Sequence, residues 1–135
     1  MDIIAAIATG HSPTAIGIVR VSGQGCFACC DRVFRAFNGS PFSQQTPRNM
    51  VFGEMLDAQG RVIDQGLAVR FPGPRSYTGE DSAEFHCHGS PVVLRELLAQ
   101  RCSMPLHFGQ SRYSSDNAVG IAALAWERRE ALGWS

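Results

Sequence analysis

The sequence predicts an α+β fold, a mixed sheet with helices packed on it. Short segments rich in β-branched and aromatic residues are separated by clusters of Gly, Pro, Asn and Asp, which is typical of strands joined by turns. Two other stretches, residues 24–37 and 91–101, repeat their apolar residues at helical spacing. Strands and helices are therefore both expected, with two strands before the first helix and three before the second.

In the first third of the chain, the apolar run Ile3 to Ala8 predicts a strand. Residues 9–16 contain Gly10, Ser12 and Pro13, which predict a loop. A second strand is expected over residues 17–21, and Ser22 is a candidate N-cap for the helix over residues 24–37.

In the following part, polar and turn-forming residues dominate residues 38–47. Strands are expected over residues 50–56 and 62–71, joined by the hairpin turn Asp57-Ala58-Gln59-Gly60. A further strand covers residues 83–88. The last predicted helix, residues 91–101, begins with a proline, whose missing N–H is harmless in a first turn.

The length and charge of the chain limit its function. At 135 residues it is one domain, or one domain with a tail. The twelve acidic residues balance twelve basic ones, all of them arginine, so the broad positive surface of a stand-alone nucleic-acid binder is not expected. No apolar run reaches the length of a membrane span, and the start does not read as a signal segment. We therefore expect a cytoplasmic protein that does not enter membranes.

The cysteines raise the question of a metal site. Cys26, Cys29 and Cys30 form a C-x-x-C-C pattern, and Cys87 lies between two histidines. A zinc site requires a second ligand pair at a fixed spacing, and none is present. The first three cysteines also fall on an amphipathic pattern with neighbouring aromatic residues, where cysteine acts as a small core residue. Core or surface thiols are the favoured interpretation, and no metal ligands are assigned.

The stretch from Phe71 to Gly89, FPGPRSYTGEDSAEFHCHG, is the most informative part of the chain, because it combines turn-forming residues with acidic and imidazole side chains. Its prolines and glycines predict a sharp turn. Residues 83–88 then alternate apolar and polar residues, which places Glu84, His86 and His88 on one face of a strand. A loop, a strand with acidic and imidazole groups, and a helix start therefore meet within one short segment.

Several catalytic motifs are absent. The sequence has no G-x-x-x-x-G-K-[ST] phosphate loop, no G-x-S-x-G and no H-E-x-x-H. GTP hydrolysis by a phosphate-loop mechanism is therefore not expected from this chain, and no catalytic residue is assigned.

The same stretch closely resembles the N-terminal domain of the MnmE (TrmE) family, GTPases that modify the wobble uridine of certain tRNAs. In that family the region has the pattern FPGPxSxTGEDxxExxxHGG, and in this chain it reads FPGPRSYTGEDSAEFHCHGSP. The segments IAAIAT, GIVRVSG and FGEMLDAQGRVIDQGLAVRFPGP agree as well, in order and spacing. The resemblance covers residues 1–102, which defines a first domain. It implies a fold similar to the tetrahydrofolate-binding domain of the glycine-cleavage T-protein.

The resemblance also implies a folate site. Glu84 matches the family glutamate that accepts the amino group and ring N–H of a pterin, and Arg20, in GIVR, matches a family arginine at the same site. The cofactor implied is a formyl- or methylene-tetrahydrofolate. Two features depart from the family: a lysine of the NxKxDL segment is missing, and GHSPTAI replaces the usual P-P-G-R-G-G loop.

Other residues of the motif are expected to support the loop rather than to bind the ligand. Adjacent carboxylates in extended chain point in different directions, so the Glu-Asp pair is not an acid/base dyad by spacing alone. The residues assigned this supporting role are Gly73, Gly79, Glu80, Asp81, His88 and Gly89.

Residues 103–135 form a divergent tail in this interpretation. Its segment SSDNAVGIAA is faintly similar to the TDNAxMIA segment of TsaD, in which the aspartate corresponding to Asp116 ligates a metal. The favoured interpretation is an amphipathic helix capped by Ser115 or Asp116, with Val119, Ile121, Leu124 and Trp126 as packing residues.

Three functions are compatible with the sequence. The first is a folate-binding and dimerisation module of the tRNA wobble-uridine (carboxymethylaminomethyl) modification system, without the GTPase domain. By resemblance its partners are a second copy of the chain, an MnmG-type flavoprotein and tRNA. The second is a truncated or chimeric remnant that keeps the fold without the ligand. The third is a stand-alone folate-dependent one-carbon transferase.

Overall fold

The computed structural model describes residues 3–9 and 13–99. In chain order the elements are β1 (Ile4–Ile7), β2 (Thr14–Ser22), α1 (Cys26–Cys30), β3 (Phe34–Ala36), the 3-10 turn η1 (Phe42–Gln44), β4 (Val51–Leu56), β5 (Val62–Phe71), β6 (Ser82–Gly89) and α2 (Pro91–Ala99). The described residues thus form a sheet of strands with two helices. The tail expected over residues 103–135, with its helix, lies outside the described residues.

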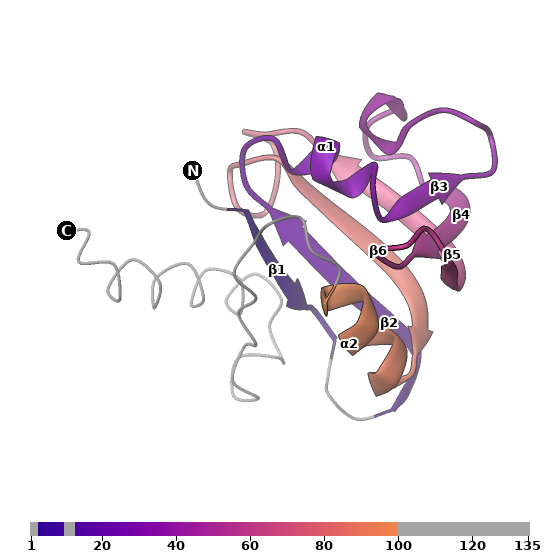
Figure 1. Cartoon of the computed structure of the whole chain (residues 1–135). Helices are drawn as coiled ribbons and strands as arrows, with labels where there is room; N and C mark the ends of the chain where they lie inside the picture. The colour runs from indigo at the N-terminus through magenta and orange to yellow at the C-terminus, as the bar shows by residue number, and fades with distance from the viewer. Residues whose placement is uncertain (1–2, 10–12, 100–135) are drawn as a thin grey trace.

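The described strands form one sheet in the order β1-β2-β6-β5-β4-β3 (Figure 1). Each pairing along this order is antiparallel, so the expectation of a mixed sheet is wrong for the described strands. β6 is the last of the described strands in sequence but is inserted between β2 and β5. This insertion places the segment around Glu84 at the centre of the sheet.

The helix predicted over residues 24–37 is the main error of the sequence analysis. Only Cys26–Cys30 is helical, and the chain then forms β3, which pairs with β4 so that Phe34 lies opposite Met55. Phe34 and Ala36 are buried while Arg35 between them is exposed, which is a strand alternation. The apolar residues that the sequence placed on a helix face are divided between a short helix and an edge strand.

The remaining elements agree with the prediction apart from their ends. β2 begins at Thr14, three residues before the expected Gly17, since it continues its pairing with β6. The hairpin between β4 and β5 is confirmed: the Asp57 carboxylate accepts hydrogen bonds from the backbone N–H groups of Gln59 and Arg61. The described part of the last helix ends at Ala99.

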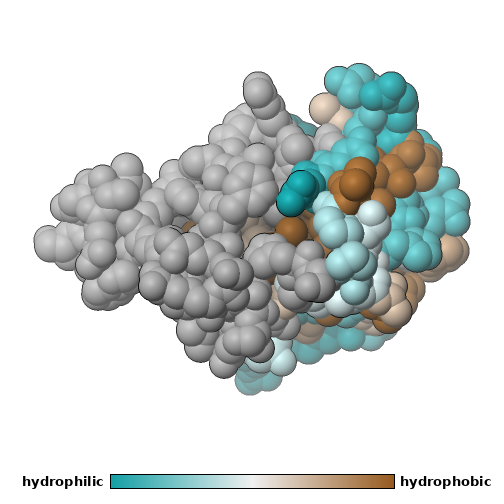
Figure 2. Space-filling view, turned by 90° about the horizontal axis from the view of Figure 1, so that it is seen from below, coloured by the Kyte–Doolittle hydropathy of each residue, from teal (hydrophilic) through white to brown (hydrophobic). Residues whose placement is uncertain are grey.

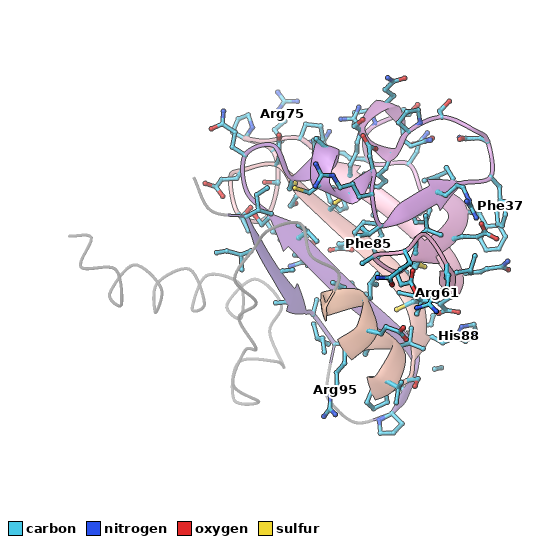
Figure 3. The ribbon with its side chains drawn as sticks, in the orientation of Figure 1. Phe37, Arg61, Arg75, Phe85, His88 and Arg95 are labelled. Carbon is cyan, nitrogen blue, oxygen red and sulfur yellow. The ribbon has the colours of Figure 1, made fainter. Side chains whose placement is uncertain are left out.

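The two faces of the sheet differ in what covers them. α1, η1 and α2 pack on one face, and their contacts enclose one apolar core. Figure 3 shows Phe85 in this interior, while Phe37 and His88 lie at the periphery. The core residues are Ala5, Val19, Val21, Cys26, Cys30, Phe34, Ala36, Phe42, Met55, Ala68, Ala83, Phe85, Cys87, Leu94 and Leu97.

The opposite face carries the residues that alternate with this core. On β2 these include Arg20 and Ser22, and on β6 they include Glu84, His86 and His88. We call this surface the open face, because α1, η1 and α2 lie on the other side of the sheet. A space-filling view from below shows apolar surface between hydrophilic areas on the described part of the molecule (Figure 2). No helix within the described ranges is long and apolar enough to cross a membrane.

Candidate functional site

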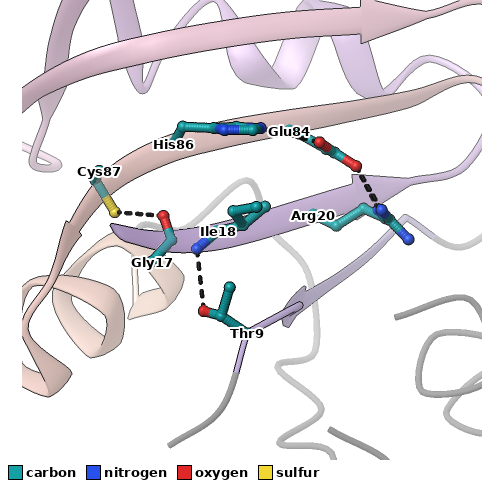
Figure 4. Close-up of polar contacts among 7 residues, drawn as sticks. All are labelled: Thr9, Gly17, Ile18, Arg20, Glu84, His86 and Cys87. Atoms are coloured by element: carbon teal, nitrogen blue, oxygen red, sulfur yellow. Dashed lines mark hydrogen bonds and ion pairs between the residues drawn. The ribbon is translucent and has the colours of Figure 1, made fainter. Parts of the chain in front are cut away.

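Arg20 and Glu84 form a buried ion pair at the centre of the open face. The register of β2 and β6 places the two residues directly opposite each other. Nε of Arg20 donates to Oε1 of Glu84 at 3.0 Å, and Nη2 of Arg20 donates to the same oxygen (Figure 4). The side chains are only 5% and 10% exposed. The two residues that the sequence selected for ligand binding are therefore in direct contact.

The second oxygen of Glu84 is bound by His86. Nε2 of His86 lies 3.0 Å from Oε2 of Glu84, and since an ionised carboxylate only accepts hydrogen bonds, the imidazole donates. Strand alternation places both side chains on the open face, as Figure 4 shows. Both oxygens of Glu84 thus have protein donors in this structure.

These contacts keep Glu84 ionised. The hydrogen bond from His86, followed by the hydrogen bonds and positive charge of Arg20, holds the pKa of Glu84 below its usual range. Burial acts in the opposite direction, because it disfavours the charged form, but it is outweighed. The site therefore offers a carboxylate acceptor at neutral pH.

One nitrogen of the Arg20 guanidinium makes no hydrogen bond to the described residues. Its guanidinium carbon lies 4.8 Å from the centre of the Tyr77 ring, so the aromatic ring covers the cation. Nη1 of Arg20 is buried and has no hydrogen-bond partner within residues 3–9 and 13–99. Such an orphaned donor is costly unless a partner arrives. The arrangement fits a ligand that brings an acceptor atom to this position.

The loop between β5 and β6 brings Tyr77 over the ion pair. The hydroxyls of Ser22 and Thr78 are 2.6 Å apart, which ties the loop to β2. The backbone N–H of Gly73 donates to Oδ1 of Asp81 at 3.0 Å. This contact joins the start of the loop to its end. Glu80 takes part through its backbone, because its carbonyl accepts from Ser76 Oγ.

The two predicted loop glycines have steric reasons to be glycine. A Cβ on Gly73 would lie 2.9 Å from the carbonyl carbon of Glu80, closer than ordinary contacts allow. Gly79 has φ 76°, in the left-handed region that glycine adopts without a Cβ clash. The close return of the loop therefore depends on both positions.

Two hollows flank this loop. One, of about 290 Å³, is lined by Phe71, Arg75, Ser76 and Tyr77. Because Phe71 lies opposite Ser82, which alternates with Ala83, this hollow is on the Glu84 side of the sheet. The other, of about 280 Å³, is lined by Gln24, Gly73, Glu80 and Asp81. The first hollow shares Tyr77 with the ion pair and extends the site.

His88 and Gly89 do not belong to the loop. They lie at the far end of β6, and Figure 3 places His88 and Arg75, a loop residue, at different ends of the molecule. The backbone N–H of His88 donates to Oδ2 of Asp64 at 2.9 Å, and Nδ1 of His88 lies 2.8 Å from Oδ1. A Cβ on Gly89 would lie 2.1 Å from the carbonyl oxygen of Thr14. These contacts hold the end of β6 against β5 and β2.

The pKa of Asp64 reflects the His88 contact. Burial of the carboxylate raises it, but the backbone and side-chain hydrogen bonds from His88 lower it more, and the result lies below the usual range. The pair therefore holds one end of the sheet rather than the ligand site.

The cysteines agree with the core interpretation. Cys26, Cys30 and Cys87 are buried, and all three belong to the apolar core. Burial, with the charge of Asp81 as the next cause, raises the pKa of Cys26 to about 12, and burial with the charge of Asp64 raises that of Cys87 to about 11. Thiols this hard to ionise are poor nucleophiles and poor metal ligands.

Sequence reasoning assigned no role to Tyr77 or to His86. The signal for His86 was present, because strand alternation already placed it beside Glu84 on the polar face. The contact of Tyr77 with Arg20 depends on how the loop folds back over the sheet. A pattern of apolar and polar residues does not predict such a loop conformation. The altered loop noted at Gly10 to Ile16 is only partly described, since residues 10–12 lie outside the described ranges.

Fold and site together define the class of the protein: an antiparallel α+β domain with a buried arginine–carboxylate pair under a Pro-Gly loop. Residues 3–115 match the family described as "GTP-binding protein TrmE N-terminus". The chain therefore belongs to this family. The match continues past residue 102 into the segment that the sequence analysis treated as a tail.

Individual relatives support this assignment. The chain is 51% identical over 102 residues to the tRNA modification GTPase MnmE of Methylibium petroleiphilum, covering 75% of this chain and 20% of that protein. It is 50% identical over 123 residues to the MnmE of Paracidovorax citrulli, covering 88% and 22%. For the MnmE of Symbiobacterium thermophilum the identity is 40% over 99 residues, covering 73% and 22%. The chain thus spans about one fifth of these relatives and corresponds to their N-terminal domain.

Proposed function

We propose that this domain is the folate-binding and dimerisation module of a tRNA wobble-uridine modification system. The observation that carries the proposal is the buried Arg20–Glu84 pair, in which Nη1 of Arg20 has no hydrogen-bond partner among the described residues. A natural domain rarely buries an arginine donor without using it. A ligand that supplies both donors and acceptors would use this pair.

A reduced pterin has the complementary groups. Its amino group and ring N–H are adjacent donors, which a carboxylate such as Glu84 accepts as a bidentate pair. Its ring carbonyl is an acceptor suited to Nη1 of Arg20. The flat ring also matches the hollow of about 290 Å³ beside Tyr77 and Phe71. The residues present therefore fit a folate, and the bound cofactor would supply a one-carbon group.

Binding requires a rearrangement of donors around Glu84. Arg20 uses Oε1 and His86 uses Oε2 in this structure. A carboxylate has about four lone-pair positions, of which Arg20 uses two on Oε1 and His86 uses one on Oε2, so a bidentate ligand has to displace a donor from Oε1. The missing family lysine removes a further contact that the resemblance implies. We therefore propose binding that is weaker than in lysine-containing relatives.

The wider role belongs to a larger assembly. The relatives are named tRNA modification GTPases, and this chain spans about one fifth of them. We propose that it acts in the cytoplasm as a homodimer and delivers the one-carbon carrier. A GTPase domain and an MnmG-type flavoprotein would complete the reaction on tRNA.

Titration calorimetry with 5-formyltetrahydrofolate tests this function. The wild-type chain is expected to bind, and Glu84→Gln to lose at least about tenfold in affinity, because one charged acceptor becomes a mixed donor and acceptor. Glu54→Gln is the matched control, since Glu54 pairs in the same manner with Arg35, whose side chain is 58% exposed. Absence of binding by the wild type would instead support the remnant. Transfer of the one-carbon group to glycine or ammonia would support the stand-alone transferase.

A further inference from the structure

The two hollows beside the loop between β5 and β6 differ in charge. The hollow that shares Tyr77 with the central ion pair is also lined by Arg75, and none of its described lining residues is acidic. We call it the arginine hollow. The other hollow is lined by the two carboxylate residues of the loop, Glu80 and Asp81. An anionic group is therefore favoured in the arginine hollow and disfavoured in the other one.

A second arginine lies against the same loop. Nη2 of Arg48 donates to the backbone carbonyl of Arg75 at 2.7 Å, and both side chains are exposed. Within residues 3–9 and 13–99 no carboxylate lies within ion-pair distance of either guanidinium. The described part of the chain thus brings two cations to one corner of the molecule and supplies no counter-charge there.

The backbone fixes Arg48 in an uncommon conformation. Its φ is 63°, in the left-handed region, and within the described ranges it is the only residue other than glycine with a positive φ. Its backbone N–H donates to the carbonyl of Arg70 at 2.9 Å, which holds it beside the end of β5. Backbone conformations of this kind are concentrated at functional sites. The side chain of Arg48 therefore starts from a fixed position next to Arg75.

The strand register gives the direction from the central ion pair to the two arginines. Glu84 lies opposite Val69 on β5, and the next residue of β5 on the same face is Phe71, which lines the arginine hollow. Arg75 follows in the loop that continues from this end of β5. A ligand that is held at Glu84 and lies along the hollow therefore presents its far end to Arg75 and Arg48.

We propose that Arg75 and Arg48 form a carboxylate subsite for the glutamyl tail of a folate, and that the preferred ligand carries a γ-linked polyglutamate chain. This inference rests on the proposed folate function. A folate has its pterin at one end and a glutamate at the other, and each added glutamate brings one more carboxylate. A guanidinium binds a carboxylate through paired hydrogen bonds. A chain of carboxylates can follow both arginines, whereas a single glutamate keeps its carboxylates at one place.

Calorimetry on the 135-residue chain tests the subsite by comparing 5-formyltetrahydrofolate with its γ-linked triglutamate form. At about 0.1 M salt the wild type is expected to bind the triglutamate about tenfold more tightly. At about 1 M salt most of this preference should disappear, because exposed charges are then screened. Arg75→Gln and Arg48→Gln should each lose more affinity for the triglutamate than for the monoglutamate.

Arg95→Gln is the matched control. Arg95 is also an exposed arginine, and Figure 3 places it at the opposite end of the molecule from Arg75. This variant should keep the wild-type preference for the triglutamate. Arg75→Gln keeps the backbone carbonyl that accepts from Arg48, so the loop contact is retained. If Arg48→Gln does not fold, the comparison of Arg75→Gln with Arg95→Gln decides alone.

The outcomes separate the subsite from the folate function. Equal wild-type affinity for the two ligands, or a triglutamate preference that survives unchanged in either arginine variant, overturns the subsite and leaves the folate function standing. An equal loss for both ligands also overturns it, because the arginines then only support the loop. Absence of wild-type binding to either ligand overturns the folate function, and the subsite falls with it.

Discussion

Two arginine–glutamate pairs cross neighbouring strands on the open face, one at the centre of the sheet and one near its edge. In both, the partners lie directly opposite each other, and the arginine Nε donates to the carboxylate at 3.0 Å. Arg35 is 58% exposed in its pair with Glu54, whereas Arg20 is 5% exposed in its pair with Glu84. The two pairs thus form the same kind of hydrogen bond, but the arginine is buried in the central pair and exposed in the edge pair.

The difference comes from the position in the sheet and from what covers it. Arg35 lies on β3, which is the last strand of the described sheet, so its guanidinium reaches water. Arg20 lies on β2 between β1 and β6, and Tyr77 covers it from the loop. Burial makes the central pair electrostatically strong and its donors hard to satisfy. A simple strand pair thereby becomes a candidate binding site.

Removal of one carboxylate should have the largest effect on this comparison. Glu84→Ala leaves the Arg20 cation buried and unpaired, and we expect the free energy of unfolding to fall by about 3–5 kcal/mol. Glu54→Ala leaves Arg35 in water and should cost about 0–1 kcal/mol. Urea unfolding of both variants, followed by circular dichroism, measures the two losses. Equal losses would show that burial does not distinguish the pairs.

Replacement of both partners of the central pair should restore most of that loss. The double variant Arg20→Met with Glu84→Leu removes both charges, and apolar replacement of a buried pair is often neutral or stabilising by about 1–4 kcal/mol. His86 can then bond to water. We expect a folded domain in urea unfolding that no longer binds 5-formyltetrahydrofolate in calorimetry. A double variant as unstable as Glu84→Ala contradicts this view of the pair.

Acid should weaken the contribution of the central pair. The fold lowers the pKa of Glu84 from its ordinary value of 4.5. Its contribution to stability is therefore fully present above about pH 4.5 and is lost as the pH falls through the folded pKa. The stability difference between wild type and Glu84→Gln, measured by urea unfolding at several pH values, should be constant near neutrality and shrink in acid. A difference that grows in acid would have the wrong sign.

Salt should produce the smallest effect and should act on the edge pair. Raising the ionic strength from about 0.1 M to about 1 M shortens the Debye length from about 10 Å to about 3 Å, which screens exposed charges. The coupling between Arg35 and Glu54, obtained from a double-mutant cycle, should lose most of its value of under about 1 kcal/mol. The same cycle on Arg20 and Glu84 should change much less, and an equal change would place both pairs in water.

Much of the fold could be predicted from local patterns. The hairpin of β4 and β5 and the strand β6 follow from alternation and turn residues, and α2 begins at Pro91 as expected. The failure at residues 31–37 has a physical cause. Helical and strand periodicities overlap over so short an apolar run, and only the pairing of Phe34 with Met55 decides for a strand. The prediction of a mixed sheet was wrong because long-range pairing decides which strands become neighbours, and therefore whether neighbouring strands run parallel or antiparallel.

The candidate site divides in the same way. The sequence alone determined the chemical groups: the arginine in GIVR, the glutamate in DSAEF, the histidine beside it and the glycines of the loop. Only the tertiary structure decided that Arg20 lies opposite Glu84 and that Tyr77 covers it. It also separated His88 from the loop and joined it to Asp64. Local sequence sets which face a side chain takes, whereas the insertion of β6 between β2 and β5 sets which side chains meet and how deeply they are buried.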